Sequence, residues 1–158
     1  MTAKRLLDSF LGKYEPGIAK TARAALRAMR KLLPGAFELV YDNYNALAIG
    51  FAASERASDA VMSIALYPRW VTLFFLDGAG LADPTGRLKG SGSRVRSIVL
   101  EKGAATIAEP DVRELIRRAI ADADPPLPKS GKGKIVIKSI SKKQRPRRPL
   151  TARASARR

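Results

Sequence analysis

The sequence predicts a single α+β domain: a mainly antiparallel sheet of five to six strands, packed by two N-terminal helices and one C-terminal helix, plus a basic tail. Apolar residues recur at helical spacing in the first 33 residues and again after Pro110, while short β-rich runs fill the region between. The 158 residues suffice for one domain with a sizeable core.

Two helices are expected at the N-terminus. The longer one covers residues 15–33, because Pro16 suits a first helical turn and Pro34-Gly35 ends the pattern. Its apolar side chains gather on one face, and the opposite face is basic, with Lys20, Arg23, Arg27, Arg30 and Lys31. A shorter helix is expected over residues 3–11.

Five β-rich runs follow the helices. They cover residues 37–41, 46–52, 60–66, 70–76 and 94–100. The connections at 42–45 and 67–69 are too short for helical crossovers, so the strands that they join should be antiparallel. The run 70–76 is apolar on both faces, which predicts a central strand.

The last helix begins near Pro110, with Asp111 and Glu114 in its first turns. Beyond Asp124 the composition changes at the proline-rich stretch 125–128. We therefore expect a domain over residues 1–124 and a basic, largely disordered tail over residues 125–158. Within that tail, residues 134–140 are apolar enough to form an edge strand.

The charge is unevenly distributed. The chain has 30 basic and 14 acidic residues, and all of the acidic ones lie between Asp8 and Asp124, whereas 12 of the basic ones lie between Lys129 and Arg158. Such a tail binds nucleic acid or other polyanions through counterion release, without reading sequence, or serves only to keep the protein soluble. The nucleic-acid candidates are Lys142, Lys143, Arg145, Arg147 and Arg148.

The absence of cysteine and histidine excludes several kinds of chemistry. Disulfides, thiolate nucleophiles, Cys/His zinc sites and His-based hydrolytic triads all require these residues. We expect no catalysis, no cofactor and no assigned metal. The N-terminus lacks the apolar core of a secretory signal, and no stretch is long enough to span a bilayer, so we expect a cytoplasmic protein without membrane contact. Its oligomeric state stays open.

A long glycine-rich loop over residues 77–93 is the first candidate site. Backbone N–H groups beside cations could hold a phosphate or carboxylate, and the anion-binding candidates are Lys89, Gly90, Gly92, Arg94 and Arg96, with Arg69 in addition. The loop lacks the spacing of a P-loop. The alternative is an ordinary turn whose arginines pair with Asp77, Asp83 or Glu101.

Two turns rich in aromatic and polar residues, 41–45 and 67–70, form the second candidate. The residues that could line a small pocket are Tyr41, Tyr44, Tyr67 and Asp77. The turns could lie at one end of the sheet or at opposite ends. The alternative is packing at the rim of the core.

Three segments carry a resemblance to a known family: YDNYNALAIGF (41–51), YPRWVTLFFLDGAGLADPTGRLKGSGSRVR (67–96) and KIVIKSISKKQRPRR (134–148). Together they resemble the YdhG-like domain family of small bacterial proteins. The resemblance covers nearly the whole chain and implies a compact α+β fold. Some members are described as frataxin-like iron chaperones, which present iron on an acidic patch. This chain departs from that pattern, since its long N-terminal helix carries five cations and, at its start, only Glu15.

These observations favour a non-catalytic binding or adaptor domain with a polycationic tail that associates with nucleic acid or other polyanions. The alternatives are a frataxin-like iron chaperone, a protein that binds a small anion through residues 77–96, and an enzyme that uses Tyr67, Asp77, Arg94 or Arg96 on a small anionic substrate.

Overall fold

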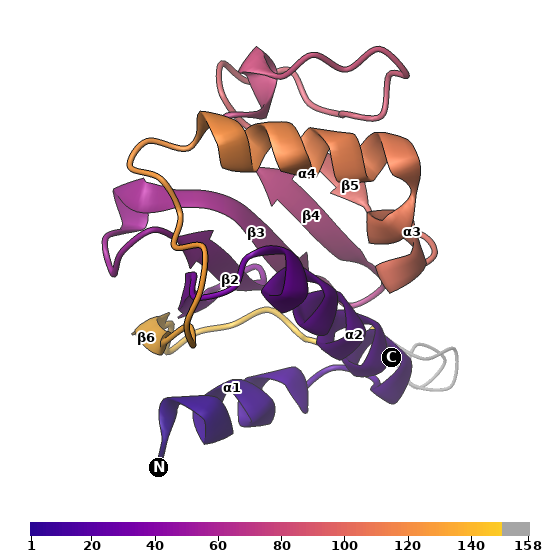
Figure 1. The fold of residues 1–158 in the computed structure, drawn as a ribbon. Coiled ribbons are helices and arrows are strands. Elements are labelled where there is room, and N and C mark those ends of the chain that lie inside the picture. The colour runs from indigo at the N-terminus through magenta and orange to yellow at the C-terminus, as the bar shows by residue number, and fades with distance from the viewer. Residues whose placement is uncertain (150–158) are drawn as a thin grey trace.

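The computed structural model describes residues 1–149 and confirms the α+β class. In this part of the chain, one six-stranded sheet is packed by four helices (Figure 1). One row of apolar residues crosses five strands in register and is fully or almost fully buried; it consists of Val40, Ile49, Ile64, Leu73 and Ile98. These side chains belong to the same core cluster as the apolar faces of the helices, so the helices cover this face of the sheet.

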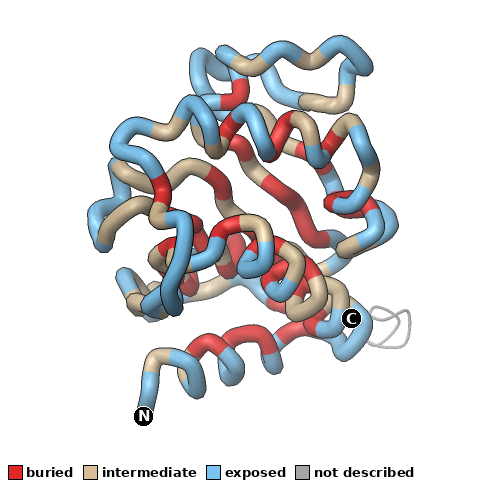
Figure 2. The backbone as a smooth tube through the Cα atoms, in the orientation of Figure 1, coloured by how far each residue is buried: buried red, intermediate tan, exposed pale blue. Residues whose placement is uncertain are grey.

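The expected helices are present within one or two residues. They are α1 (Ala3–Leu11), α2 (Pro16–Leu32) and α4 (Pro110–Asp122). The sequence did not predict α3 (Ala104–Ala108), because five residues are too few to show a helical period. Buried residues concentrate along the strands and on the inner sides of the helices (Figure 2).

The strands lie in the order β5-β4-β3-β2-β1-β6. Their bounds are β1 (Phe37–Asp42), β2 (Leu47–Ala52), β3 (Ala60–Leu66), β4 (Val71–Phe75), β5 (Arg96–Val99) and β6 (Ile135–Ile140). The first five pair antiparallel, but β6 runs parallel to β1, so the sheet is mixed. The parallel pairing arises because the segment after α4 returns to the start of β1 before it enters the sheet, and Glu38 N–H donates to Lys134 O there at 2.9 Å.

The β1–β2 and β3–β4 turns lie at the same end of the sheet, which we call the turn end. Leu47 pairs with Asp42 on one side and with Leu66 on the other, and Leu66 pairs with Val71. The buried Tyr14 connects both turns: its hydroxyl accepts from Leu47 N–H at 3.1 Å and donates to Leu66 O at 3.0 Å. The loop after α1 therefore closes the core at this end.

The segment after α4 differs from the largely disordered tail that composition predicts. Leu127 is buried, and β6 completes the sheet at the position expected for an edge strand. Residues 141–149, which we call the C-terminal strap, then cross the turn end. Ser141 N–H donates to Asp42 O and Arg145 N–H donates to Tyr44 O, both at 2.9 Å. Backbone pairing therefore continues past the strand; residues 150–158 lie outside the described part.

Candidate functional site

The glycine-rich loop is held mostly by contacts within the protein. The Asp83 carboxylate accepts from the N–H groups of Arg87 and Leu88, each at 2.9 Å. The Arg87 guanidinium donates to Glu109 at 3.0 Å and to Asp111 at 3.1 Å, which ties the loop to the start of α4. Lys89 pairs with Ser97 through backbone groups at 2.9 Å, while its side chain is exposed. The loop is thus ordered against the domain by its own cations and carboxylates.

The two arginines proposed for anions have other partners. Arg94 lies before β5 rather than on it, and its guanidinium pairs with Asp77 at 2.7 Å. Arg96 donates to the carbonyl oxygens of Gly92 at 2.6 Å and Val95 at 2.8 Å. Gly90 has φ +127°, a conformation that suits glycine. The arginine–Asp77 pairing foreseen as the alternative is therefore present, and the anion site stays a prediction.

The turn end gathers exposed aromatic rings. Tyr44 and Trp70 are 46% and 47% exposed, and Trp70 lies at a tilt to Tyr67 with ring centroids 5.7 Å apart. Neighbouring strands lie about 4.8 Å apart, and the β1–β2 and β3–β4 turns are centred two strand spacings from each other. The centres of the two turns are therefore about 10 Å apart. Of the other pocket candidates, Tyr41 is on β1, and Asp77 follows β4 at the opposite end of the sheet, so Asp77 does not join the tyrosines.

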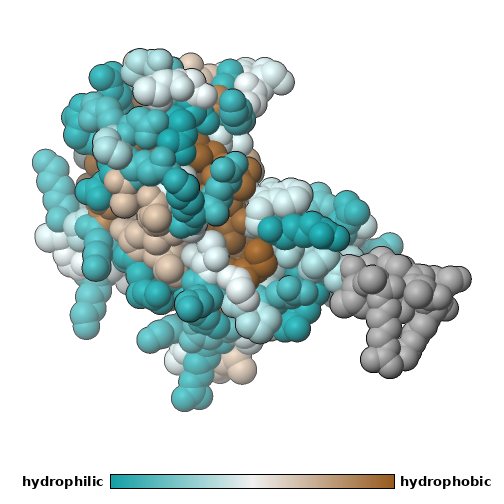
Figure 3. All heavy atoms as spheres, turned by 90° about the vertical axis from the view of Figure 1, so that its right-hand side faces the viewer, coloured by the Kyte–Doolittle hydropathy of each residue, from teal (hydrophilic) through white to brown (hydrophobic). Residues whose placement is uncertain are grey.

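The C-terminal strap brings cations to the same end. Arg145 is exposed and is fixed by its backbone beside Tyr44, and Arg148 donates from Nε to Lys13 O at 3.1 Å. Several exposed cations here form no ion pair with a carboxylate of the described residues: Arg69, Lys142, Lys143, Arg145 and Arg148. Figure 3 faces the side on which the described chain ends and shows hydrophilic side chains on both sides of a hydrophobic band.

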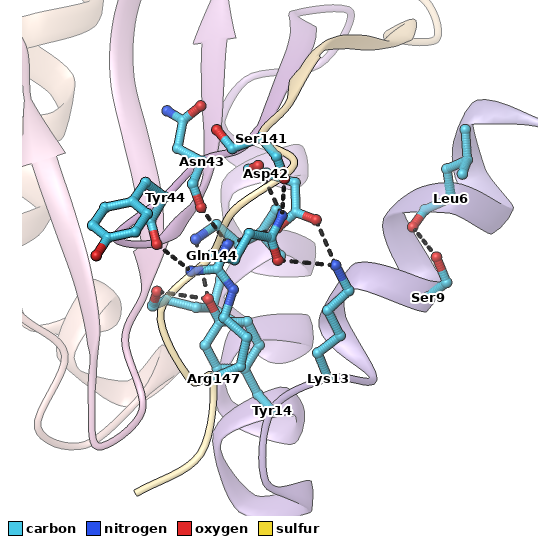
Figure 4. A network of polar contacts seen from close by, with 12 residues as sticks. Leu6, Ser9, Lys13, Tyr14, Asp42, Asn43, Tyr44, Ser141, Gln144 and Arg147 are labelled. Atoms are coloured by element: carbon cyan, nitrogen blue, oxygen red, sulfur yellow. Dashed lines mark hydrogen bonds and ion pairs between the residues drawn. The ribbon is translucent and has the colours of Figure 1, made fainter.

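A buried charge cluster fixes the strap. Asp42 is fully buried, and its carboxylate accepts from Lys13 Nζ at 2.7 Å and from Arg147 Nη2 at 2.9 Å (Figure 4). The side chain of Arg147 is 5% exposed and also donates to the carbonyl oxygens of Asn43 and Tyr44. Its guanidinium lies 5.8 Å from the centre of the Tyr14 ring. The Gln144 side chain adds a bond to Asp42 O at 3.1 Å.

The cluster shifts the titration of its members. Burial alone would raise the pKa of Asp42, but the donors around it, Lys13 first, hold that pKa below its usual value. Burial raises the pKa of Tyr14. At neutral pH the carboxylate is therefore ionised and shared between two cations.

The cluster divides the nucleic-acid candidates into two groups. Arg147 is buried against Asp42, so it serves the fold and is not free to contact a phosphate. Lys142, Lys143, Arg145 and Arg148 remain exposed. Sequence reasoning missed Lys13 and Tyr14 as members of this region, because contacts between the loop after α1 and segments distant in the chain leave no local signal. Trp70 belongs to the turn 67–70 that the sequence singled out, although it was not among the residues expected to line a pocket.

The arrangement places unpaired cations beside exposed aromatic faces. Cations bind phosphates, and aromatic faces stack on bases, so the turn end is suited to single-stranded nucleic acid. Among the described residues, no three Asp or Glu side chains are grouped to hold a metal ion, and no helix has the length and apolarity needed to cross a membrane. Comparison with protein-family models, curated proteins and solved structures gives no match for this chain.

Proposed function

We propose that the protein is a non-catalytic nucleic-acid-binding protein that holds single-stranded segments at its turn end. The observation that carries this proposal is the position of Arg145, whose backbone is bonded to Tyr44 next to the exposed ring of that residue. Stacking on an exposed ring contributes about 1–3 kcal/mol per base and tolerates any base. The strap cations add phosphate contacts that do not read sequence.

Exposed rings favour single strands over duplexes. A base within a duplex is already stacked on its neighbours, so it cannot cover Tyr44 or Trp70 without leaving the helix. The unpaired cations would bind both forms through their phosphates. Preference for single strands is therefore the property that separates this site from a simple polycation.

Trp70 is the only tryptophan of the chain, so its fluorescence reports directly on the site. Titration of the full chain with a 15-nucleotide oligo-dT should quench this fluorescence to saturation. A duplex of equal length should quench less and bind more weakly. Polyphosphate serves as a polyanion without bases and should bind without comparable quenching.

Charge variants with a matched control test the cations. Replacement of Lys142, Lys143 and Arg145 by Ala should weaken oligo-dT binding at least tenfold, because three phosphate contacts are removed. The control triple replaces Lys4, Arg56 and Lys132, which are also exposed but lie toward the end of the sheet opposite the turn end, and it should change affinity less than threefold. Equal losses in both triples, or no quenching of Trp70, would contradict the proposed site.

The alternatives from the sequence have less support. Arg94 and Arg96 are engaged within the 77–96 loop, which leaves Lys89 as the exposed cation there without an ion pair to a described residue. No grouping of acidic side chains among residues 1–149 favours an iron role.

A further inference from the structure

A groove runs along the side of α2 that faces α3, α4 and the segment after α4. Two adjoining hollows form it, with volumes of about 570 Å³ and 510 Å³, and they share Lys31 and Leu32. The first lies between α2 and the α3–α4 pair, and the second between the ends of α2 and α4 and residues 126–129. Figure 1 shows α2 and α4, the longer helices on either side of this groove.

The floor of the groove is apolar and shallow. On α2 it is formed by Ala24, Ala28 and Leu32, which recur every four residues and therefore lie in one row. Ile107 and Ile120 contribute from the other wall. Because alanine side chains are short, the backbone of a docked segment can approach α2 closely.

The rim carries only positive charge. The lining residues of the two hollows include Arg27, Lys31, Arg113 and Lys129 but no Asp or Glu. All four cations are exposed, and none forms an ion pair with a carboxylate of the described residues. The neighbouring Arg23 and Arg30 differ, since they pair with Asp8 at 2.9 Å and with Glu38 at 2.8 Å. Of the α2 cations, Arg27 and Lys31 therefore line the groove without a carboxylate partner among the described residues.

We propose that this groove binds an acidic amphipathic helix of a partner protein. From Ala24 to Leu33 the α2 wall is about 14 Å long at 1.5 Å per residue, enough for two to three turns of a docked helix. Arg27 and Lys31 lie one turn apart, so they match carboxylates one turn apart on the partner. The apolar face of such a helix would cover the alanine row, which phosphates of a nucleic acid would leave bare.

A designed peptide tests the groove in the full chain. The probe is a fluorescein-labelled 16-residue helix-forming peptide with Leu along one face and Glu on both flanks. The reference has the same composition, with its Leu residues spread around the helix. Fluorescence anisotropy should show at least tenfold tighter binding of the ordered peptide.

Variants locate the binding. Arg27→Glu with Lys31→Glu should weaken binding of the ordered peptide at least tenfold. The control of equal charge change is Arg5→Glu with Arg56→Glu, two exposed cations that neither line nor adjoin the groove, and it should change the affinity less than threefold. Ala28→Trp fills the floor without changing charge and should also weaken binding at least tenfold. Far-UV circular dichroism checks that each variant stays folded.

Three outcomes would overturn the proposal. The first is equal binding of the ordered and spread peptides, and the second is equal loss in the groove and control variants. The third is binding to a lipid surface: vesicles of anionic phospholipid bind the wild-type chain but not the Arg27→Glu, Lys31→Glu variant, while the ordered peptide binds no tighter than its reference. That result would assign the groove to a membrane surface.

Discussion

Asp42 and Arg147 are 105 residues apart in the chain, yet together with Lys13 they form a buried charge cluster. A fully buried carboxylate is costly unless it is paired and hydrogen-bonded. Asp42 has both kinds of compensation, and Arg147 is also bonded to two carbonyl oxygens. The pairing explains why the most basic part of the chain packs against the domain: one of its arginines neutralises a charge that β1 places in the interior.

Asp42→Asn should lower the free energy of unfolding by about 3 kcal/mol, because it leaves the buried Arg147 without a counter-charge. Urea unfolding followed by circular dichroism measures this loss. The double variant with Arg147→Met should recover part of it, since the orphaned charge is then removed as well. If Asp42→Asn unfolds at the wild-type urea concentration, the buried pair does not stabilise the fold.

The same cluster predicts how stability depends on pH. The pKa of Asp42 is lower in the folded protein than the ordinary value of about 3.9, so between these two values the unfolded chain binds more protons. Stability from this group is therefore present above about pH 4 and is lost as the pH falls through the folded-state pKa. Urea midpoints measured from pH 2 to 5 should fall less steeply for Asp42→Asn than for the wild type.

Glu114 provides the control for that measurement. Its pKa is lowered to about 2 by hydrogen bonds from Arg117 and Arg118, but the group is exposed on α4. Glu114→Gln should therefore leave the acid dependence nearer to that of the wild type, because exposed ion pairs contribute little.

Among the elements, β6 and the C-terminal strap have the largest structural consequence. The strand supplies the neighbour that β1 lacks on its outer side, and the strap supplies Arg147. Both lie in the segment 125–158 that composition predicts to be largely disordered, although the sequence also indicated a possible edge strand over residues 134–140. Deleting the segment to test binding would therefore also remove part of the sheet.

A chain that ends at Pro128 should lose several kcal/mol of stability, a large part of the 5–15 kcal/mol usual for a domain. It lacks the β6 pairing and leaves Asp42 with Lys13 as its remaining charged partner among the described residues. Thermal unfolding by circular dichroism measures the loss. Full-length protein with Lys142 and Lys143 changed to Ser should melt near the wild type, because those side chains are exposed. An unchanged melting temperature on truncation would show that β6 and the strap add no stability.

At the scale of the whole molecule, the net charge is +16, and the basic residues behind it differ in what they contact. Some cations form ion pairs within the fold, as Arg30 and Arg87 do. Others form no ion pair with a carboxylate of the described residues, and among these are the cations of the turn end and of the α2 groove. The two proposals therefore assign a different partner to each of these two surfaces. Net charge alone does not locate either surface.

Salt dependence tests how many phosphates the proposed nucleic-acid site contacts. If the five unpaired cations of the turn end contact phosphates, the slope of log K against log salt for oligo-dT should be about −3.5. Anisotropy titrations between 50 and 300 mM salt, which bracket the usual working range, give this slope. A slope near zero would show that phosphate contacts contribute little to binding.

Local patterns predicted most of the elements but little of the site. The periodicity of α2 is a local signal that predicts the helix. The short β1–β2 and β3–β4 turns are local signals as well, and they predict that the strands they join pair antiparallel. The five residues of α3 and the direction of β6 have no such signal. Arg147 and Lys142 are alike in sequence context, and only the three-dimensional path of the strap separates the buried cation from the exposed one.

The parallel pairing of β6 with β1 also has a consequence for synthesis. The ribosome makes β1 early, but the strand and arginine that complete its surroundings emerge only after about a hundred further residues. Until then, nascent chains expose one edge of β1 and a carboxylate that lacks half of its neutralising charge. Products of premature termination share these defects, so cellular proteases and chaperones can distinguish them from finished molecules.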